Sequence, residues 1–172
     1  MKLIEDTLEI GKKRIFHLLI TTPHRVEYWM HVELPEDKTL KDLDDFIRDI
    51  WVECCGHLSA FTIENTRYYS HYEDLDRFNL HKIKEENMDI PAGNVLHVGL
   101  KFNYEYDFGS PTRLTLKVLS EREGSIKEKS IQLMARNDPP KRVCVVCGKP
   151  AKWICTQCIA IEKEFLCDEC AK

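Results

Sequence analysis

The chain has 172 residues, of which 43% are hydrophobic and 31% charged, and its formal net charge is −4. This length suits one domain of ordinary size plus a small appendage, and the composition is that of a folded globular protein, which excludes a disordered chain. A weakly acidic balance also argues against a nonspecific nucleic-acid binder, which needs a basic surface.

The first predicted elements are a hairpin followed by a helix. Residues 15–21 form an apolar run, and residues 26–34 alternate apolar with polar side chains, which is typical of a strand with one buried face. In residues 40–52 apolar side chains recur at three- and four-residue spacing, which predicts an amphipathic helix. Thr39 followed by Asp42 resembles a capping box at its start.

More strands are expected after the helix, together with one short helical segment. They are predicted near residues 58–69, 101–108, 112–120 and 131–136, with the short helix beginning around Pro91. The clearest pattern is the alternation of aromatic with polar residues in 101–108, and Gly109-Ser110-Pro111 predicts the turn after it.

This order of elements predicts an α+β domain in which a mixed β-sheet packs one face on a helix, much as in β-grasp folds. We assign it to residues 1–137. Two prolines in Asn137-Asp138-Pro139-Pro140 stiffen the chain and remove backbone donors, so residues 138–140 are expected to be a Pro-rich linker. Residues 141–172 then form a separate tail.

Six of the eight cysteines stand in three Cys-x-x-Cys pairs in this tail: Cys144/Cys147, Cys155/Cys158 and Cys167/Cys170. Each pair places two thiolates on one tight turn, and two such turns complete a tetrahedral sulfur shell that suits Zn²⁺. A disulfide framework is the alternative, but the paired spacing and the lack of an export signal favour metal. The tail is too short to bury a core of its own, so a structural zinc ion is expected to supply its folding energy.

Two other constellations invite a catalytic interpretation. In Cys54-Cys55-Gly56-His57 a thiol and an imidazole lie close along the chain, but buried cysteines and a Gly56 helix cap explain the segment better. Asp107 precedes Phe108-Gly109 as in kinases, yet the other kinase motifs are absent, so a turn role is expected. We predict no catalytic residues and no enzymatic activity.

Aromatic residues on the predicted strands have two possible roles. Tyr104, Tyr106 and Trp29 could stack on the bases of single-stranded nucleic acid. Aromatic residues that alternate along strands more often belong to the core, and few basic residues surround these, so core positions are favoured.

Several segments together resemble the plasmid pRiA4b open-reading-frame family: Thr39-Leu40-x-x-Leu43, Gly56-His57-Leu58-x-x-Phe61 and Tyr104-Glu105-Tyr106-Asp107-Phe108-Gly109. The resemblance covers about residues 13–137 and implies a compact α+β domain without an established enzymatic activity. Some members are labelled as related to transposition because of where their genes lie. The common form of the family has an acidic residue, Trp and His after the glycine, where this chain has Ser110-Pro111-Thr112-Arg113.

The tail is similar to the cross-braced treble-clef fingers of the HIT and MYND type. In those fingers alternate pairs share a metal, so the resemblance implies one complete zinc site from Cys144, Cys147, Cys167 and Cys170. A sequential site from Cys144, Cys147, Cys155 and Cys158 is the competing assignment.

Under the interleaved assignment Cys155 and Cys158 are left as a second, incomplete zinc site. No histidine follows His97, so the tail offers six ligands where two full sites need eight. The pair could take ligands from elsewhere or remain reduced. The resemblance favours a finger that is cut short, because related tails continue through a His-x-Cys-type segment.

Two classes of function follow from these observations. The first expectation is a non-catalytic binding or adaptor module whose zinc finger contacts a protein partner. The alternative is a nucleic-acid-associated protein linked to plasmids or transposons. Neither needs a membrane, and the nearly uncharged stretches 15–23 and 51–63 are too short and mixed to span one, so a cytoplasmic protein is expected.

Overall fold

A computed structural model of the chain describes residues 12–23, 27–52, 56–71, 83–124, 130–138, 140–154 and 165–172. The chain divides into two compact units, Met1–Asn137 and Asp138–Lys172, and each is described by itself. In the described part of the chain, no helix has the length and hydropathy needed to cross a bilayer.

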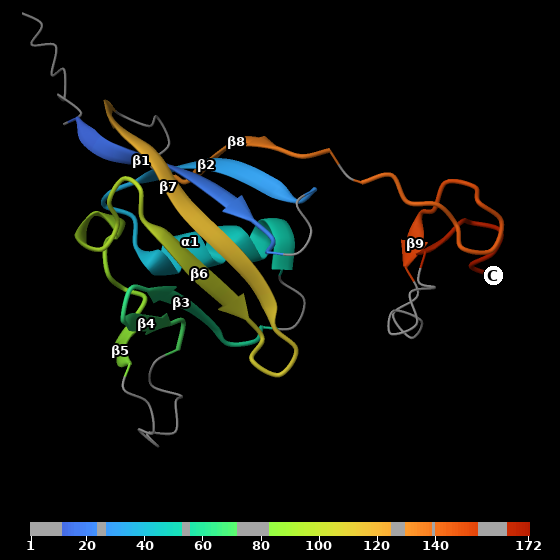
Figure 1. Cartoon of the computed structure of the whole chain (residues 1–172), viewed down its shortest axis with the longest axis horizontal. Helices are drawn as coiled ribbons and strands as arrows, with labels where there is room; N and C mark the ends of the chain where they lie inside the picture. The colour runs from blue at the N-terminus through green and yellow to red at the C-terminus, as the bar shows by residue number, and fades with distance from the viewer. Residues whose placement is uncertain are drawn as a thin grey trace, which may run out of the picture. The chain divides into compact units, whose positions relative to one another are not determined.

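The first unit is built on an eight-stranded sheet with the order β5-β4-β3-β6-β7-β1-β2-β8 (Figure 1). The strands are β1 (Lys13–Thr21), β2 (Trp29–Pro35), β3 (Ser59–Ile63), β4 (Thr66–Tyr69), β5 (Lys84–Asn87), β6 (Lys101–Tyr106), β7 (Thr112–Gly124) and β8 (Gln132–Arg136). Neighbouring strands are antiparallel except β4 and β5, which run parallel, so the sheet is mixed. With the helix α1 (Leu40–Ile47) packed on one face, the arrangement is α+β.

The helix begins as the sequence predicts. The backbone N–H of Asp42 donates to Thr39 Oγ1 at 3.0 Å, and the backbone N–H of Thr39 donates to Asp42 Oδ2 at 2.8 Å, which confirms the capping box. After Ile47 the helix widens into a π-helical turn, η1 (Arg48–Val52). Its apolar stripe is buried because it packs on the strands of the sheet.

The prediction of one strand over residues 58–69 is wrong, because the chain turns at Glu64 and Asn65 to form β3 and β4. Glu64 adopts a left-handed φ of 51°, which permits this tight reversal. The edge strand β5 was not predicted, since its sequence Lys-Glu-Glu-Asn has no apolar alternation. The helix expected at Pro91 is a single 3-10 turn, η3 (Ala92–Asn94).

The side chains of β6 point alternately to the buried and to the exposed face of the sheet. Tyr104 and Tyr106 are 0% and 3% exposed and point toward α1, which confirms that they belong to the core. Trp29 was also expected in the core, and this is wrong. It is half-buried and lies on the opposite face of the sheet from its buried neighbour Met30.

A buried carboxylate ties α1 to the sheet. Asp44 is fully buried, and its Oδ1 accepts hydrogen bonds from Tyr104 Oη and Ser59 Oγ, both at 2.7 Å. Its Oδ2 accepts from Arg48 Nε at 2.9 Å. Burial first, and then the negative charge of Asp44, raise the pKa of the Tyr104 phenol far above its usual range, so Tyr104 stays a hydrogen-bond donor.

At one edge of the sheet, β8 pairs only with β2, and a register shift interrupts the pairing between Leu133 and Ala135. Side chains from Leu133 to Arg136 are exposed. The second unit contains a short antiparallel pair, β9 (Trp153–Ile154) and β10 (Phe165–Leu166). This pair was not predicted.

Candidate metal centre

Four cysteine sulfurs of the second unit gather at one point. The Sγ atoms of Cys144, Cys147, Cys167 and Cys170 all lie within 4.8 Å of one another. Cys147 Sγ is 3.6 Å from Cys167 Sγ and 3.7 Å from Cys170 Sγ. These distances are far from the ~2.05 Å of a disulfide bond, and all four cysteines are free.

The spacing fits a tetrahedral metal site. Four sulfurs bound at about 2.3 Å to a central ion are about 3.8 Å from one another, close to the separations found here. Each cysteine supplies one soft ligand, and four thiolates form a closed set of the kind that structural sites use. The four residues can therefore hold one metal ion.

Tight turns position the first pair of ligands. Gly148 has a φ of +73°, a left-handed conformation that glycine adopts without strain. Its backbone N–H donates to the Cys144 carbonyl at 2.8 Å, and the Cys144 N–H donates to the Lys149 carbonyl at 2.7 Å. These bonds fold the chain back so that both sulfurs of the pair face the same side.

The β9–β10 pair brings the other two cysteines to that turn. The backbone N–H of Val145 donates to the Phe165 carbonyl at 3.0 Å, which links the first turn to the start of β10. Cys167 follows directly after β10, and the Ala171 N–H closes the second turn on the Cys167 carbonyl at 3.0 Å. Distant parts of the tail thus converge on one cluster.

Backbone donors prepare two of the ligands for metal binding. Burial raises the pKa of the Cys144 thiol, but backbone N–H groups, led by that of Cys167, outweigh it and lower the pKa to about 6. The pKa of Cys167 is also lowered, chiefly by the backbone N–H of Cys170. Hydrogen bonds to neighbouring thiols raise the pKa of Cys170 to about 12. Since only thiolates bind metal, the backbone favours the binding form at the two buried positions.

Among the described residues, the sulfurs that cluster are the four that the interleaved assignment names. Cys155 and Cys158, which the sequential assignment requires and which are expected to form a second, incomplete site, lie outside the described residues.

The other candidate residues are more dispersed. His57 Nε2 lies 4.0 Å from Asp107 Oδ2, which is beyond hydrogen-bonding range. Asp107 has a left-handed φ of 60° and accepts the Gly109 backbone N–H at 3.0 Å, as a turn residue does. Cys54 and Cys55 lie outside the described residues. Gly56 has a left-handed φ of 72°.

No pattern along the chain predicts the Asp44 cluster. An aspartate in a helix with acidic neighbours at Asp42 and Asp45 looks like a solvated residue. Only the pairing of β3 with β6 brings Ser59 and Tyr104 beneath it.

The chain thus combines an α+β domain with a cysteine cluster able to hold one metal ion. A protein-family model described as "Plasmid pRiA4b ORF-3-like protein" matches residues 16–148, and the chain belongs to that family. The match extends through Cys144 and Cys147.

Among solved structures, the chain is similar to a protein of unknown function from Methanosarcina mazei Go1. The two share 15% sequence identity with a TM-score of 0.61, over 73% of this chain and 71% of the other. At that identity the likeness shows the fold alone. No curated protein matches the chain.

Proposed function

We propose that the protein is a non-catalytic binding module whose C-terminal unit is a treble-clef-like zinc finger that docks on a protein partner. The α+β domain, β-grasp-like in its order of elements, would carry this finger. The observation that carries the proposal is the exposed apolar surface of the finger around Trp153.

Trp153 is held in place while most of its ring stays accessible. The residue is 57% exposed, and its neighbour Ile154 is 53% exposed. The indole Nε1–H donates to Asp168 Oδ1 at 2.8 Å, and Lys152 Nζ pairs with Asp168 Oδ2 at 2.6 Å. An aromatic ring that is already fixed loses little entropy on binding, which is why such residues often dominate protein interfaces.

A cavity beside this ring offers a site for an apolar side chain. It has a volume of about 590 Å³ and is lined by Trp153, Ile154, Leu166, Asp168, Ala171 and Lys172. Further exposed valines lie in the same unit at positions 143, 145 and 146. So many exposed large apolar residues in a small unit favour a surface that a partner covers.

The metal would make this surface possible. Among the described residues of the unit, the only buried apolar side chains are Cys144 and Cys167. Within these residues the buried side chains are those of the sulfur cluster, and a bound zinc ion would supply folding free energy to this small unit.

The charge distribution supports a protein partner over nucleic acid. Most described basic side chains are paired with carboxylates, which lowers their attraction for phosphates. Examples are Arg14 with Glu36, Lys38 with Asp42, Arg122 with Glu33, Lys149 with Glu169 and Lys152 with Asp168. The nucleic-acid alternative stays a prediction, and salt-sensitive retention of DNA or RNA would support it.

The experiment compares capture of cellular proteins by the full chain, by Trp153→Ala and by Val98→Ala. Val98 is the control, because it is 48% exposed and belongs to the first unit. We expect Trp153→Ala to lose specific protein partners while it keeps one equivalent of zinc, and Val98→Ala to retain them. Equal capture by all three proteins, or capture that nuclease treatment abolishes, would contradict the proposal.

A further inference from the structure

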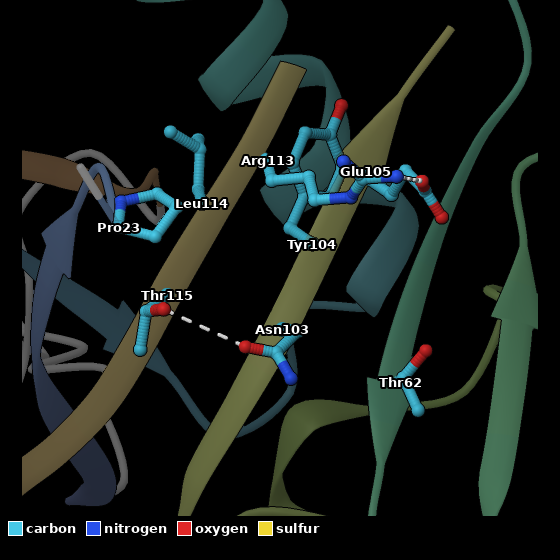
Figure 2. A pocket seen from close by; sticks show the side chains of 8 residues that line it. All are labelled: Pro23, Thr62, Asn103, Tyr104, Glu105, Arg113, Leu114 and Thr115. Carbon is cyan, nitrogen blue, oxygen red and sulfur yellow. Dashed lines mark hydrogen bonds and ion pairs between the residues drawn. The ribbon is translucent and has the colours of Figure 1, made fainter. Parts of the chain in front are cut away.

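The face of the sheet opposite α1 is open, because none of the described helices packs on it (Figure 1). Its middle part is polar. Thr62, Asn103 and Thr115 line a hollow there beside the ion pair of Glu105 with Arg113, which leaves the hollow without a net charge (Figure 2). The strands β1 and β2 carry a different group of side chains on the same face.

Two histidines of β1 and β2 meet on this face. His17 Nε2 lies 2.8 Å from His31 Nδ1, and the two ring centroids are 5.0 Å apart. The residues are diagonal neighbours across the strand pair, since His17 is opposite Glu33 and His31 is opposite Leu19. Among the described histidines, these are the two whose ring nitrogens come into contact.

The sheet holds both histidines in place. β1 is paired on both sides, with β2 and β7, and β2 is paired with β1 and β8. Both histidines are half-buried, and Trp29 packs edge-on against the His31 ring with the ring centroids 5.5 Å apart. Two ligands on neighbouring strands of a sheet lose little conformational entropy when they bind an ion.

The protonation of the pair suits metal binding. Burial first, and then the charge of His17, lowers the pKa of His31 below its ordinary value, so this imidazole is neutral at neutral pH. A neutral imidazole keeps a lone pair on one ring nitrogen, and a contact between two such rings needs only one proton between them. A metal ion can replace that proton, because imidazole nitrogen is a common ligand of divalent transition metals.

The distance between the two nitrogens favours one type of coordination. Two nitrogens bound at about 2.1 Å to one ion are about 3.0 Å apart at right-angled positions and about 3.4 Å apart at tetrahedral positions. The separation of 2.8 Å between His17 and His31 is nearer to the right-angled arrangement, which Ni²⁺ and Cu²⁺ prefer. Each ring has to turn until its lone pair points at the ion instead of at the other nitrogen.

The surrounding charges argue against a hard cation such as Ca²⁺ or Mg²⁺. Glu33 is opposite His17, but both of its oxygens accept hydrogen bonds from Arg122, at 2.7 and 2.6 Å. Lys117, two strands from His31 on β7, adds positive charge. Hard cations need several free oxygen ligands, which this group of side chains does not offer. Binding therefore depends on the imidazole nitrogens.

We propose that His17 and His31 form a binding site for a divalent transition-metal ion of the Ni²⁺ and Cu²⁺ type on the open face of the sheet. The ion is held by His17 Nε2 and His31 Nδ1, and water molecules fill its remaining positions. The proton that the two rings share is released to solvent when the ion binds. The site is separate from the cysteine cluster and depends neither on the finger nor on any protein partner.

The test is an NMR titration of the ¹⁵N-labelled full chain with Ni²⁺ in the presence of one equivalent of zinc. Paramagnetic Ni²⁺ broadens the signals of nearby amides, so the amide signals of His17, Leu19 and His31 should be lost first and saturably. His17→Gln and His31→Gln each leave one nitrogen ligand and should weaken binding at least about tenfold. His97→Gln is the control, because the His97 side chain is 64% exposed, and its affinity for Ni²⁺ should be unchanged.

Further measurements separate coordination from nonspecific binding and from loss of structure. Mg²⁺ at the same concentration should leave these signals unchanged, and a response to Mg²⁺ equal to that to Ni²⁺ would contradict the proposal. The spectra of the variants without Ni²⁺ show whether they keep the fold. Equal broadening around all described histidines, or unchanged affinity of either folded variant, would overturn the proposal. So would broadening confined to the amides around the cysteine cluster.

Discussion

Replacing Asp44 by Asn tests whether the buried carboxylate holds α1 on the sheet. The change keeps the shape of the side chain and still allows Ser59 and Tyr104 to donate to its oxygen. At the other position an amide N–H would face Arg48 Nε, which is also a donor and which lies 2.9 Å from Asp44 Oδ2. The Arg48 side chain is only 10% exposed, so water cannot fully replace the lost acceptor.

The expected loss in the free energy of unfolding is about 3 kcal/mol, because a hydrogen bond to a charged group contributes about 1.5–3 kcal/mol and a buried unpaired charge adds to the cost. Urea unfolding of the full chain, followed by far-UV circular dichroism with zinc present, measures it. Asp45→Asn is the matched control: Asp45 is the next residue of the helix, its side chain is 57% exposed, and it pairs with Lys41 at the surface. The control should lose no more than about 0.5 kcal/mol. A loss below about 1 kcal/mol for Asp44→Asn would refute the reasoning.

Two further predictions concern the metal and pH. Cys167→Ser should release the bound metal and unfold the second unit while Met1–Asn137 stays folded; native mass spectrometry and NMR measure both, and a metal-free protein with an ordered tail would contradict the site. Hydrogen bonds from Arg122, opposed by partial burial, lower the pKa of Glu33 below its ordinary value of 4.5. The ionised pair therefore stabilises the fold above pH 4.5, and this contribution is lost as the pH falls toward the lowered pKa of Glu33. We expect the difference in free energy of unfolding between wild type and Arg122→Gln, measured by denaturation across this range, to shrink at acid pH. A constant difference would show that the Glu33–Arg122 pair does not cause the pH dependence.

The helix and the central strands could be predicted because their own residues determine them. The capping box at Thr39 and the alternation in β6 are local patterns, and burial in the structure follows both. β5 could not be found, because it is formed by pairing with β4 and its charged residues carry no periodic signal. The split of residues 58–69 depends on a two-residue turn at Glu64, where no glycine marks the reversal.

In the metal site, too, the local features could be predicted from the sequence and the contacts between distant segments could not. Cys-x-x-Cys spacing identifies ligand pairs, because each pair sits on one turn. Which pairs meet depends on the β9–β10 pairing, and two-residue strands leave no detectable pattern. The alignment of Thr62, Asn103, Thr115 and Thr21 across the sheet is also invisible along the chain, since these residues come from four strands and align only through the register.

The exposed edge strand β8 affects the length of the chain segment that connects the two units. The side chains of Leu133 to Arg136 bury little surface, so separating β8 from β2 would leave the core closed. Such a local opening costs only a fraction of the free energy of global unfolding. Each residue released would lengthen the connection to the tail by up to about 3.4 Å. Asn137 closes the end of β8 on β2, because its backbone N–H donates to the Trp29 carbonyl at 3.1 Å and its Oδ1 accepts from the Trp29 N–H at 2.9 Å. We expect the tether between the two units to lengthen when these bonds and the edge pairing open together, and rapid hydrogen exchange of the β8 amides relative to those of β1 would report this opening.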